Sequence, residues 1–302
     1  MRTRRSWLTL AEESRLAVPV LAASGGAGRS TVAGLVAAAL SQNGRVLVVD
    51  AVEHLGSPWS GWVDLPGAGL RSITELARPE AAEVFAACSA MQTHTDRPLS
   101  VLTDTAAPLE PTRQLDAYPG QCVTFAAVAG YRLAVVDTDL PALGELACAH
   151  HGTTTTATAD WLVEPSAVPV LCVPTSGHGL EDALIVVTLM EALGLPAHRV
   201  VVALVDIAPG PLPRRAKASL ALLAGRVGPI VGIPHDKRIR AVGLREFRKL
   251  GDRTTSAGDA LARAVLALAA TNPSRPRLVP AGPSKEERKS DELAVAYEPA
   301  AR

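Results

Sequence analysis

The chain has 302 residues and a mass of 31.4 kDa, a length that suits one large α/β domain or two average domains. Apolar residues make up 48% of the sequence and the mean hydropathy is +0.19, which excludes a chain that is disordered throughout. The 30 Lys and Arg residues balance the 30 Asp and Glu residues, so no net charge draws the whole protein to nucleic acid or to an anionic membrane.

The cysteines and the apolar stretches indicate a cytoplasmic protein. The four cysteines have no C-x-x-C spacing, which argues against a zinc knuckle and a disulfide framework. Charged residues interrupt the stretch that follows the basic start 1–5, so we identify no export signal. The richest apolar stretch, 183–205, is broken by Gly, Pro and charged residues, and we predict no transmembrane segment. We expect a place at the periphery of a membrane-bound or cell-pole machine.

Short apolar runs alternate with helical patterns along most of the chain. Strands are predicted at 16–23, 45–50, 99–102, 133–137, 168–173, 200–205 and 230–233. The i, i+3, i+4 spacing from Ser30 predicts a helix that ends near Gly44. Further helical patterns lie near 79–90, 142–150, 179–193, 213–225 and 256–270. Because the strands lack polar alternation, we predict an α/β fold with a single doubly wound, mostly parallel sheet of about seven strands and helices on both faces.

Composition divides the chain into three parts. Residues 1–14 are predicted to be an N-terminal arm, and residues 15–271 carry the alternating strands and helices of one domain. Residues 272–302 are rich in Pro and charge and poor in large apolar side chains, so we predict a flexible tail.

A glycine-rich loop stands between the first predicted strand and the first predicted helix. Its sequence, from Ala23 to Thr31, is ASGGAGRST. Backbone N–H groups of such a loop can surround a phosphate, and the helix N-terminus favours negative charge. A dinucleotide fingerprint that starts at Gly26 would need a small residue where Thr31 stands, so a P-loop fits better. The alternative that remains open is a strand-to-helix turn that binds nothing.

This loop resembles the deviant Walker A box, K-G-G-x-G-K-[ST]-[ST], of the ParA/MinD-type P-loop ATPases. Three further segments resemble other motifs of the family: RVLVVDA at 45–51, YRLAVVD at 131–137 and IPHD at 233–236. In order and spacing the resemblance covers roughly residues 16–270. The resemblance implies the family's doubly wound fold and a site for ATP or ADP with magnesium.

The resemblance also implies roles for individual residues. The nucleotide-binding residues would be Ser24, Gly25, Gly26, Ala27, Gly28, Arg29, Ser30, Thr31, Pro234 and Asp236. Ser30 would bind the magnesium ion and Asp137 would hold its water shell. Thr31 would lie near the α-phosphate, whereas Pro234 and Asp236 would approach the base or the ribose. Asp50 would be the first acid of switch I and, with Glu53, a catalytic residue.

The sequence departs from the family pattern at the positions whose side chains take part in ATP hydrolysis. Ser24 replaces the signature lysine, Arg29 replaces the Walker lysine, and no lysine precedes Lys217. The planar guanidinium of an arginine does not reproduce a compact ammonium group. Val52 replaces the second acid of D-x-D, with Glu53 one residue later. Because phosphoryl transfer depends on positioning and electrostatic stabilisation, these changes predict a weak or inactive ATPase.

Several functional alternatives stay open at this stage. The first is a scaffold or positioning factor for a cellular machine, in secretion or conjugation, septum placement or partition. The second is a slow but genuine ATPase in which Arg29 and Glu53 substitute for the lost groups. The third is a nucleotide-cofactor enzyme on a doubly wound sheet, which no recognisable nucleophile, base or acid pair supports.

Partner surfaces are less clearly indicated. The resemblance implies a homodimer, and the segment with Trp59 and Trp62 either packs against the body or binds a protein partner. The basic run 237–249 is read as a solvated helix face, and DNA binding is not favoured. His150 and His151 precede a threonine run, and a solvated loop is favoured there over a metal site.

Overall fold

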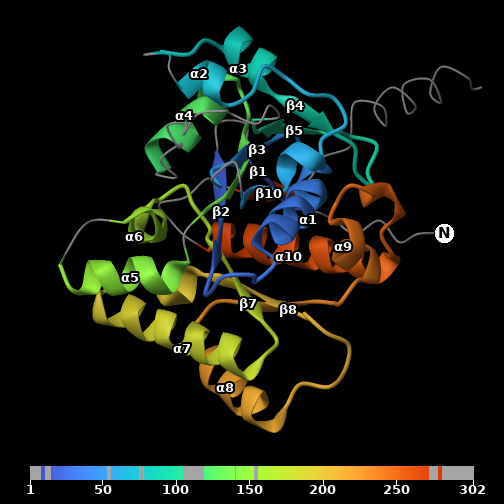
Figure 1. Cartoon of the computed structure of the whole chain (residues 1–302). Coiled ribbons are helices and arrows are strands. Elements are labelled where there is room, and N and C mark those ends of the chain that lie inside the picture. Colours follow the sequence, from blue (N-terminus) through green and yellow to red (C-terminus); the bar gives the residue numbers. More distant parts are fainter. Residues whose placement is uncertain are drawn as a thin grey trace, which may run out of the picture.

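The computed structural model describes residues 8–10, 15–52, 56–74, 76, 78–104, 119–139, 141–152, 156–271 and 278–280. An eight-stranded sheet with the order β4-β5-β3-β6-β2-β7-β8-β9 forms the centre of the molecule (Figure 1). Its strands are β2 (Leu16–Ala22), β3 (Val46–Asp50), β4 (Ser89–Met91), β5 (Leu99–Leu102), β6 (Leu133–Asp137), β7 (Val170–Pro174), β8 (Val201–Val205) and β9 (Ile230–Ile233).

The predicted doubly wound, mostly parallel sheet is confirmed. Strands β5, β3, β6, β2, β7, β8 and β9 pair in parallel, and β4 pairs antiparallel with β5 at one edge. Every residue of β2, β3, β6 and β7 is buried, which explains their continuous apolar sequences.

The sheet has eight strands, one more than the predicted count of about seven. The additional strand, β4, starts at the end of the range 79–90 that was predicted as a helix and runs to Met91. Only Ala81–Ala87 of that range forms a helix, α3, after which Ser89 and Met91 turn inward and pair with Val101 and Leu99. The run is too short for its periodicity to separate a helix from a strand.

Helices cover both faces of the sheet. The main helices are α1 (Arg29–Ser41), α4 (Pro119–Val128), α5 (Ala142–His150), α6 (Ala157–Val163), α7 (Gly177–Ala192), α8 (Arg214–Ala224) and α10 (Asp252–Ala270). Shorter ones are α2 (Arg71–Thr74), α9 (Lys237–Val242) and the 3-10 turns η2 (Trp59–Gly61), η3 (Ala197–Arg199) and η4 (Phe247–Lys249). The predicted helices at 142–150, 179–193, 213–225 and 256–270 are confirmed to within a few residues.

Successive residues of β2 point to opposite sides and so join different cores. Val18 and Val20 pack in the cluster that contains α1 and α10, whereas Ala17 packs with residues of α4 and Leu21 with residues of α5 and α7. Helices α1 and α10 also pack against each other, with the backbone of Leu35 close to Gly258. The first strand and the first helix are therefore fixed from both sides of the sheet.

Two short strands lie in the predicted arm and tail. Strand β1 (Leu8–Leu10) pairs antiparallel with β10 (Leu278–Pro280), which places these two segments side by side although they are far apart in the sequence. The rest of the ranges 1–14 and 272–302, apart from these strands, lies outside the described residues. The arm at 1–14, the domain at 15–271 and the tail at 272–302 stay predictions.

Within the described part of the chain, no helix is long and apolar enough to cross a membrane.

Candidate phosphate-binding site

The glycine loop has the backbone of a phosphate-binding turn. It joins β2 to the 13-residue α1, and Gly26 and Gly28 have φ values of +73° and +75°, a region that favours glycine. Gly28 is the N-cap of α1, and its carbonyl accepts the first helical hydrogen bond from the Val32 N–H. A Cβ on Gly25 or Gly26 would meet nothing within 4 Å, so the loop is open on its outer side. The turn and the helix N-terminus therefore suit an anionic phosphate.

The loop lies at the carboxyl edge of the sheet, where doubly wound folds bind their ligands. Ala27 is buried, while Ser24, Gly28, Arg29, Ser30 and Thr31 are half-buried and Gly25 and Gly26 are exposed. A Cβ on Gly28 would come within 3.3 Å of Cγ1 of Val205, the last residue of β8. The structure thus brings together all eight loop residues singled out by the sequence.

Arg29 is turned toward an acid at the end of a neighbouring strand. Its Nε lies 3.2 Å from Oδ1 of Asp137, and its Nη2 lies 4.0 Å from Oδ1 of Asp139. The Arg29 side chain is 16% exposed and that of Asp137 is fully buried. Neither Arg29 Nε nor Asp137 Oδ1 makes an aligned hydrogen bond, so opposite charge holds the pair.

A second group contacts the other oxygen of Asp137. The indole N–H of Trp59 donates a hydrogen bond to Oδ2 at 2.8 Å, and the Ser30 hydroxyl also interacts with the carboxylate. Burial raises the pKa of Asp137, and the charge of Arg29 is the largest of the contacts that oppose this rise. Each carboxylate oxygen thus lies beside a group of the chain itself, Oδ1 beside the Arg29 charge and Oδ2 beside the Trp59 donor.

Asp50 ends β3 beside Asp137 but has different partners. Its Oδ2 accepts hydrogen bonds from the hydroxyls of Ser57 at 2.6 Å and Thr103 at 2.7 Å, and its Oδ1 accepts one from Val52 N–H at 3.3 Å. Burial raises the pKa of Asp50 to about 7 in spite of these bonds. In this arrangement Asp50 organises the segment after β3, and its catalytic role stays a prediction. Glu53, the other predicted catalytic acid, lies outside the described residues.

Trp59 is not available as a surface anchor, which corrects one of the two interpretations of its segment. Its side chain is fully buried in the core beneath η2, where it donates to Asp137. Trp62 is half-buried and meets Trp59 edge to face, with ring centroids 5.3 Å apart. Arg245 fixes the same segment, because its Nε donates to the Gly61 carbonyl at 3.0 Å. The segment packs against the body, so a partner surface would have to use Trp62 and the residues around it.

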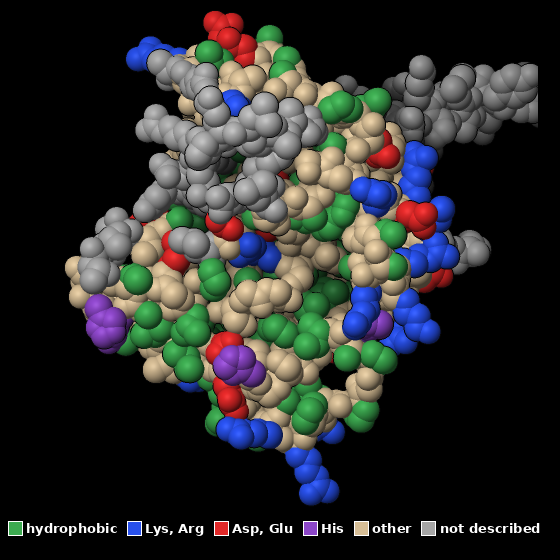
Figure 2. All heavy atoms as spheres, in the orientation of Figure 1, with side chains coloured by type: hydrophobic (Ala, Val, Ile, Leu, Met, Phe, Trp, Pro, Cys, Tyr) green, Lys and Arg blue, Asp and Glu red, His purple; other side chains and the backbone are tan. Residues whose placement is uncertain are grey.

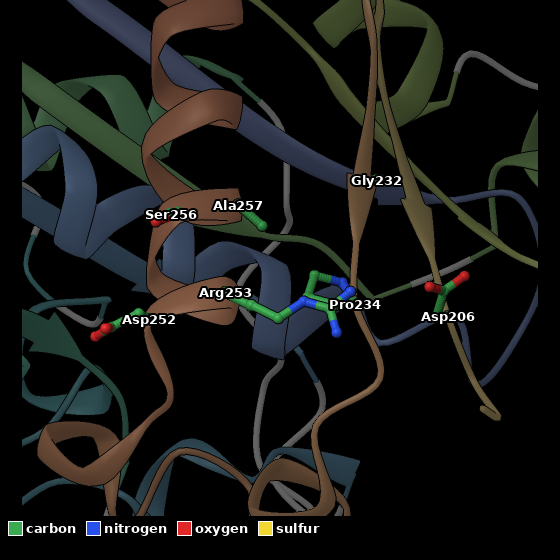
Figure 3. Close-up of a pocket in the computed structure, with 7 residues that line it drawn as sticks. All are labelled: Asp206, Gly232, Pro234, Asp252, Arg253, Ser256 and Ala257. Carbon is green, nitrogen blue, oxygen red and sulfur yellow. The ribbon is translucent and has the colours of Figure 1, made fainter. Parts of the chain in front are cut away.

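The two residues predicted to approach the base or the ribose occupy different environments. Pro234 lines a cavity of about 540 Å³, and Figure 3 shows the Arg253 side chain extending toward it from α10. The other lining residues are Asp206, Gly232, Asp252, Ser256 and Ala257. Asp236 instead caps α9, accepting from Arg238 N–H at 2.8 Å, and takes a second bond from Thr254 at 2.7 Å. Its carboxylate is therefore engaged within the fold.

Two weaker predictions concern the surface. The basic side chains of 237–249 are all exposed, on α9, on η4 and at Arg245 between them, and several are paired within the chain: Arg248 with Gln92, Lys249 with Glu246. Figure 2 shows a group of Lys and Arg side chains on the right-hand side of this face and others at its lower edge. His150 and His151 are exposed, and in the described part of the chain no group of three or more His, Cys, Asp or Glu could hold a metal ion.

Sequence reasoning missed the contacts that complete the site. Trp59 was expected either to pack against the body or to bind a partner, not to contact Asp137, and Ser57 and Thr103 were not singled out at all. A tryptophan and a serine a few residues after an aspartate that ends a strand occur in loops of many different conformations. Nothing in the sequence indicates which carboxylate each would reach, because the pairing depends on how the segment after β3 folds back.

The comparisons agree with this geometry. No protein-family model and no curated protein matches the chain. A ParA family ATPase from Chlorobium tepidum TLS has a similar structure, with 16% identity, 83% of this chain and 98% of that chain covered, and a TM-score of 0.58. The septum site-determining protein MinD from Pyrococcus horikoshii OT3, complexed with Mg-ADP, matches with 21% identity and a TM-score of 0.54. This match covers 82% of this chain and 94% of that chain. A chain of the MinC:MinD cell division protein complex from Aquifex aeolicus matches with 17% identity and a TM-score of 0.54, and the match covers 83% of this chain and 96% of that chain.

These likenesses establish the fold. The chain has the doubly wound α/β fold of the ParA/MinD-type P-loop ATPases.

Proposed function

We propose that this protein is a ParA/MinD-like nucleotide-binding protein with a degenerate site, a weak or inactive ATPase that acts as a positioning or scaffold factor for a cellular machine. The ligand of the loop would be ATP or ADP. Two features support a nucleotide: the left-handed glycines of the loop and the N-terminus of the 13-residue α1.

The orientation of Arg29 carries the proposal. The only basic side chain of the loop sequence 23–31 is placed against Asp137, at 3.2 Å, instead of extending over the loop. Its positive charge is compensated by that buried acid and by Asp139 nearby. A γ-phosphate at the loop would lack the free cation that stabilises charge in the transition state of phosphoryl transfer. Binding geometry is kept while the catalytic group is engaged elsewhere.

Magnesium, which the fold implies, does not fit the arrangement of these side chains. Mg²⁺ sites in proteins use one or two carboxylates together with substrate phosphates and water. Here Asp137, the acid at the end of the Walker B-like strand, has Arg29 on one oxygen and Trp59 on the other, and Ser30 interacts with the same carboxylate. We therefore derive no catalytic step through the metal.

A scaffold role requires partners, and the proposal includes a homodimer and a protein partner in a larger assembly. Of the solved structures with this fold, one holds MinD together with MinC. The segment around Trp62 and the exposed Arg245 is the part of the site region that a partner could reach, because Trp59 behind it is buried.

Phosphate release tests the proposal. Wild-type protein with millimolar ATP and Mg²⁺ should release phosphate no faster than the Asp137→Ala variant prepared in the same way. A rate clearly above that control would identify a genuine ATPase and contradict the proposal. Nucleotide binding is measured separately by the rise in melting temperature with ATP, ADP or GTP, since a ligand of the folded state stabilises it by mass action.

A further inference from the structure

The environment of Asp137 resembles that of a carboxylate beside a bound cation. The carboxylate is fully buried, and a lone charge there would carry a large desolvation cost. The Arg29 guanidinium supplies the compensating charge from 3.2 Å, and a second acid, Asp139, stands 4.0 Å from the same guanidinium. The arginine therefore lies between two acids at the mouth of the loop, a position that suits a positive ion.

Neutral donors also lie against Asp137, although its Oδ1 accepts no hydrogen bond among the described residues. Trp59 donates to Oδ2 at 2.8 Å, and the Ser30 hydroxyl interacts with the carboxylate as well. Trp59 itself cannot move aside easily, because it is fully buried and its segment is fixed by Arg245 on the Gly61 carbonyl. A hydrated ion at Asp137 would therefore have to displace the guanidinium from Oδ1 or the indole from Oδ2.

We propose, building on the proposed function, that the Arg29 guanidinium replaces the divalent cation at Asp137, so that the site binds phosphate ligands without any metal ion. A divalent ion would have to displace the guanidinium from a buried acid and then stand beside it with like charge, which is unfavourable at short range and low dielectric. The side chain that substitutes for the Walker lysine thus also substitutes for the metal.

Electron paramagnetic resonance of Mn²⁺, used as the probe ion, tests this inference. Spectra of Mn²⁺ with ADP are recorded with and without wild-type protein, and the protein should cause no loss of the free Mn²⁺ signal, because it would at most take ADP away from the ion. The Arg29→Lys variant, with a shorter and more flexible cation that can leave Asp137, should acquire ADP-dependent Mn²⁺ binding. The double variant Arg29→Lys with Asp137→Ala should lose that binding again. Arg215→Ala, which removes an exposed arginine paired with Glu181, is the matched control and should behave like the wild type.

Two results of the Mn²⁺ binding experiment would overturn the inference. Mn²⁺ binding by the wild type overturns the inference, and so does an Arg29→Lys variant that folds but gains no binding. If that variant does not fold, Arg29→Ala takes its place and should gain binding for the same reason. The proposed function is tested independently by phosphate release: a chain that binds Mn²⁺ at Asp137 and hydrolyses nothing contradicts only the inference, and metal-free hydrolysis contradicts only the proposed function.

Discussion

Asp50 and Asp137 are register partners at the carboxyl ends of the neighbouring parallel strands β3 and β6. Both acids are buried, yet they are stabilised in different ways: Asp50 accepts from hydroxyls, whereas Asp137 faces a guanidinium and an indole N–H. Burial is the largest influence on the pKa of each and raises both. The difference in partners leads to different predictions for the two sites.

Asp50 should make the protein less stable as the pH rises from about 4 to about 7. The pKa of Asp50 is about 7 in the folded chain and 3.8 ordinarily, so the folded state binds this proton more tightly than the unfolded state. The resulting stabilisation is fully present when the pH is below the ordinary pKa, and it is lost as the pH rises through the pKa of Asp50 in the folded chain. At about 1.4 kcal/mol per pKa unit, the loss amounts to as much as about 4 kcal/mol.

The Asp50→Asn variant checks this effect, because its amide stays neutral at every pH. Its free energy of unfolding, measured by urea denaturation at pH 5 and pH 8, should change less between the two than that of the wild type. Thr103→Val removes a donor to the same oxygen without removing the acid, and this control should keep the pH dependence. An equal pH slope in Asp50→Asn and the wild type would show that Asp50 is ionised in the folded state throughout.

Trp59→Phe should lower the free energy of unfolding by about 2 kcal/mol, the range expected for losing a hydrogen bond to a charged group. The substitution keeps an aromatic ring in the core but leaves Oδ2 of the buried Asp137 without its indole donor. Trp62→Phe, at the half-buried neighbouring ring, should cost clearly less. Urea denaturation of the two variants compares them directly, and equal costs would mean that the hydrogen bond to Asp137 contributes little.

Gly28→Ala should cost about 1–2 kcal/mol, because an L-residue pays roughly this amount in the left-handed region. The φ of Gly28 is +75°, and the added Cβ would lie 3.3 Å from Val205 Cγ1. Gly25→Ala is the matched control in the same loop, since Gly25 is not among the positive-φ glycines and its Cβ would meet nothing within 4 Å. Thermal denaturation should separate the two variants. Similar melting temperatures would contradict the loop geometry.

The fold could be predicted from the sequence because its signal is repeated and local. Unbroken apolar runs such as that of β2, followed by glycines and then by a helical pattern, indicate buried parallel strands joined through helices. Some short elements were not predicted. Strand β4 has only three residues and helix α6 has seven, so neither has enough length for its period to be recognised.

The position of the candidate site could be predicted from the sequence, but most of the side-chain contacts within it could not. The place of Arg29 in the loop followed from the sequence, but its orientation toward Asp137 depends on β2 and β6 lying side by side. The hydrogen bond from Trp59 crosses 78 positions of the chain. Asp236 is the N-cap of α9, a role that Asp fills in many helices, and its approach to the base or the ribose stays a prediction.

We propose that the loop keeps the shape for a nucleotide but directs its cation to Asp137 instead of to the phosphates. The decisive experiment is a calorimetric titration of ATP with Mg²⁺ into the wild type and into the double variant Ser24→Lys with Arg29→Lys. The double variant should bind at least about tenfold more tightly, a gain of about 1.4 kcal/mol, because both lysines reach the phosphates. An unchanged affinity would mean that the loop is not the nucleotide site.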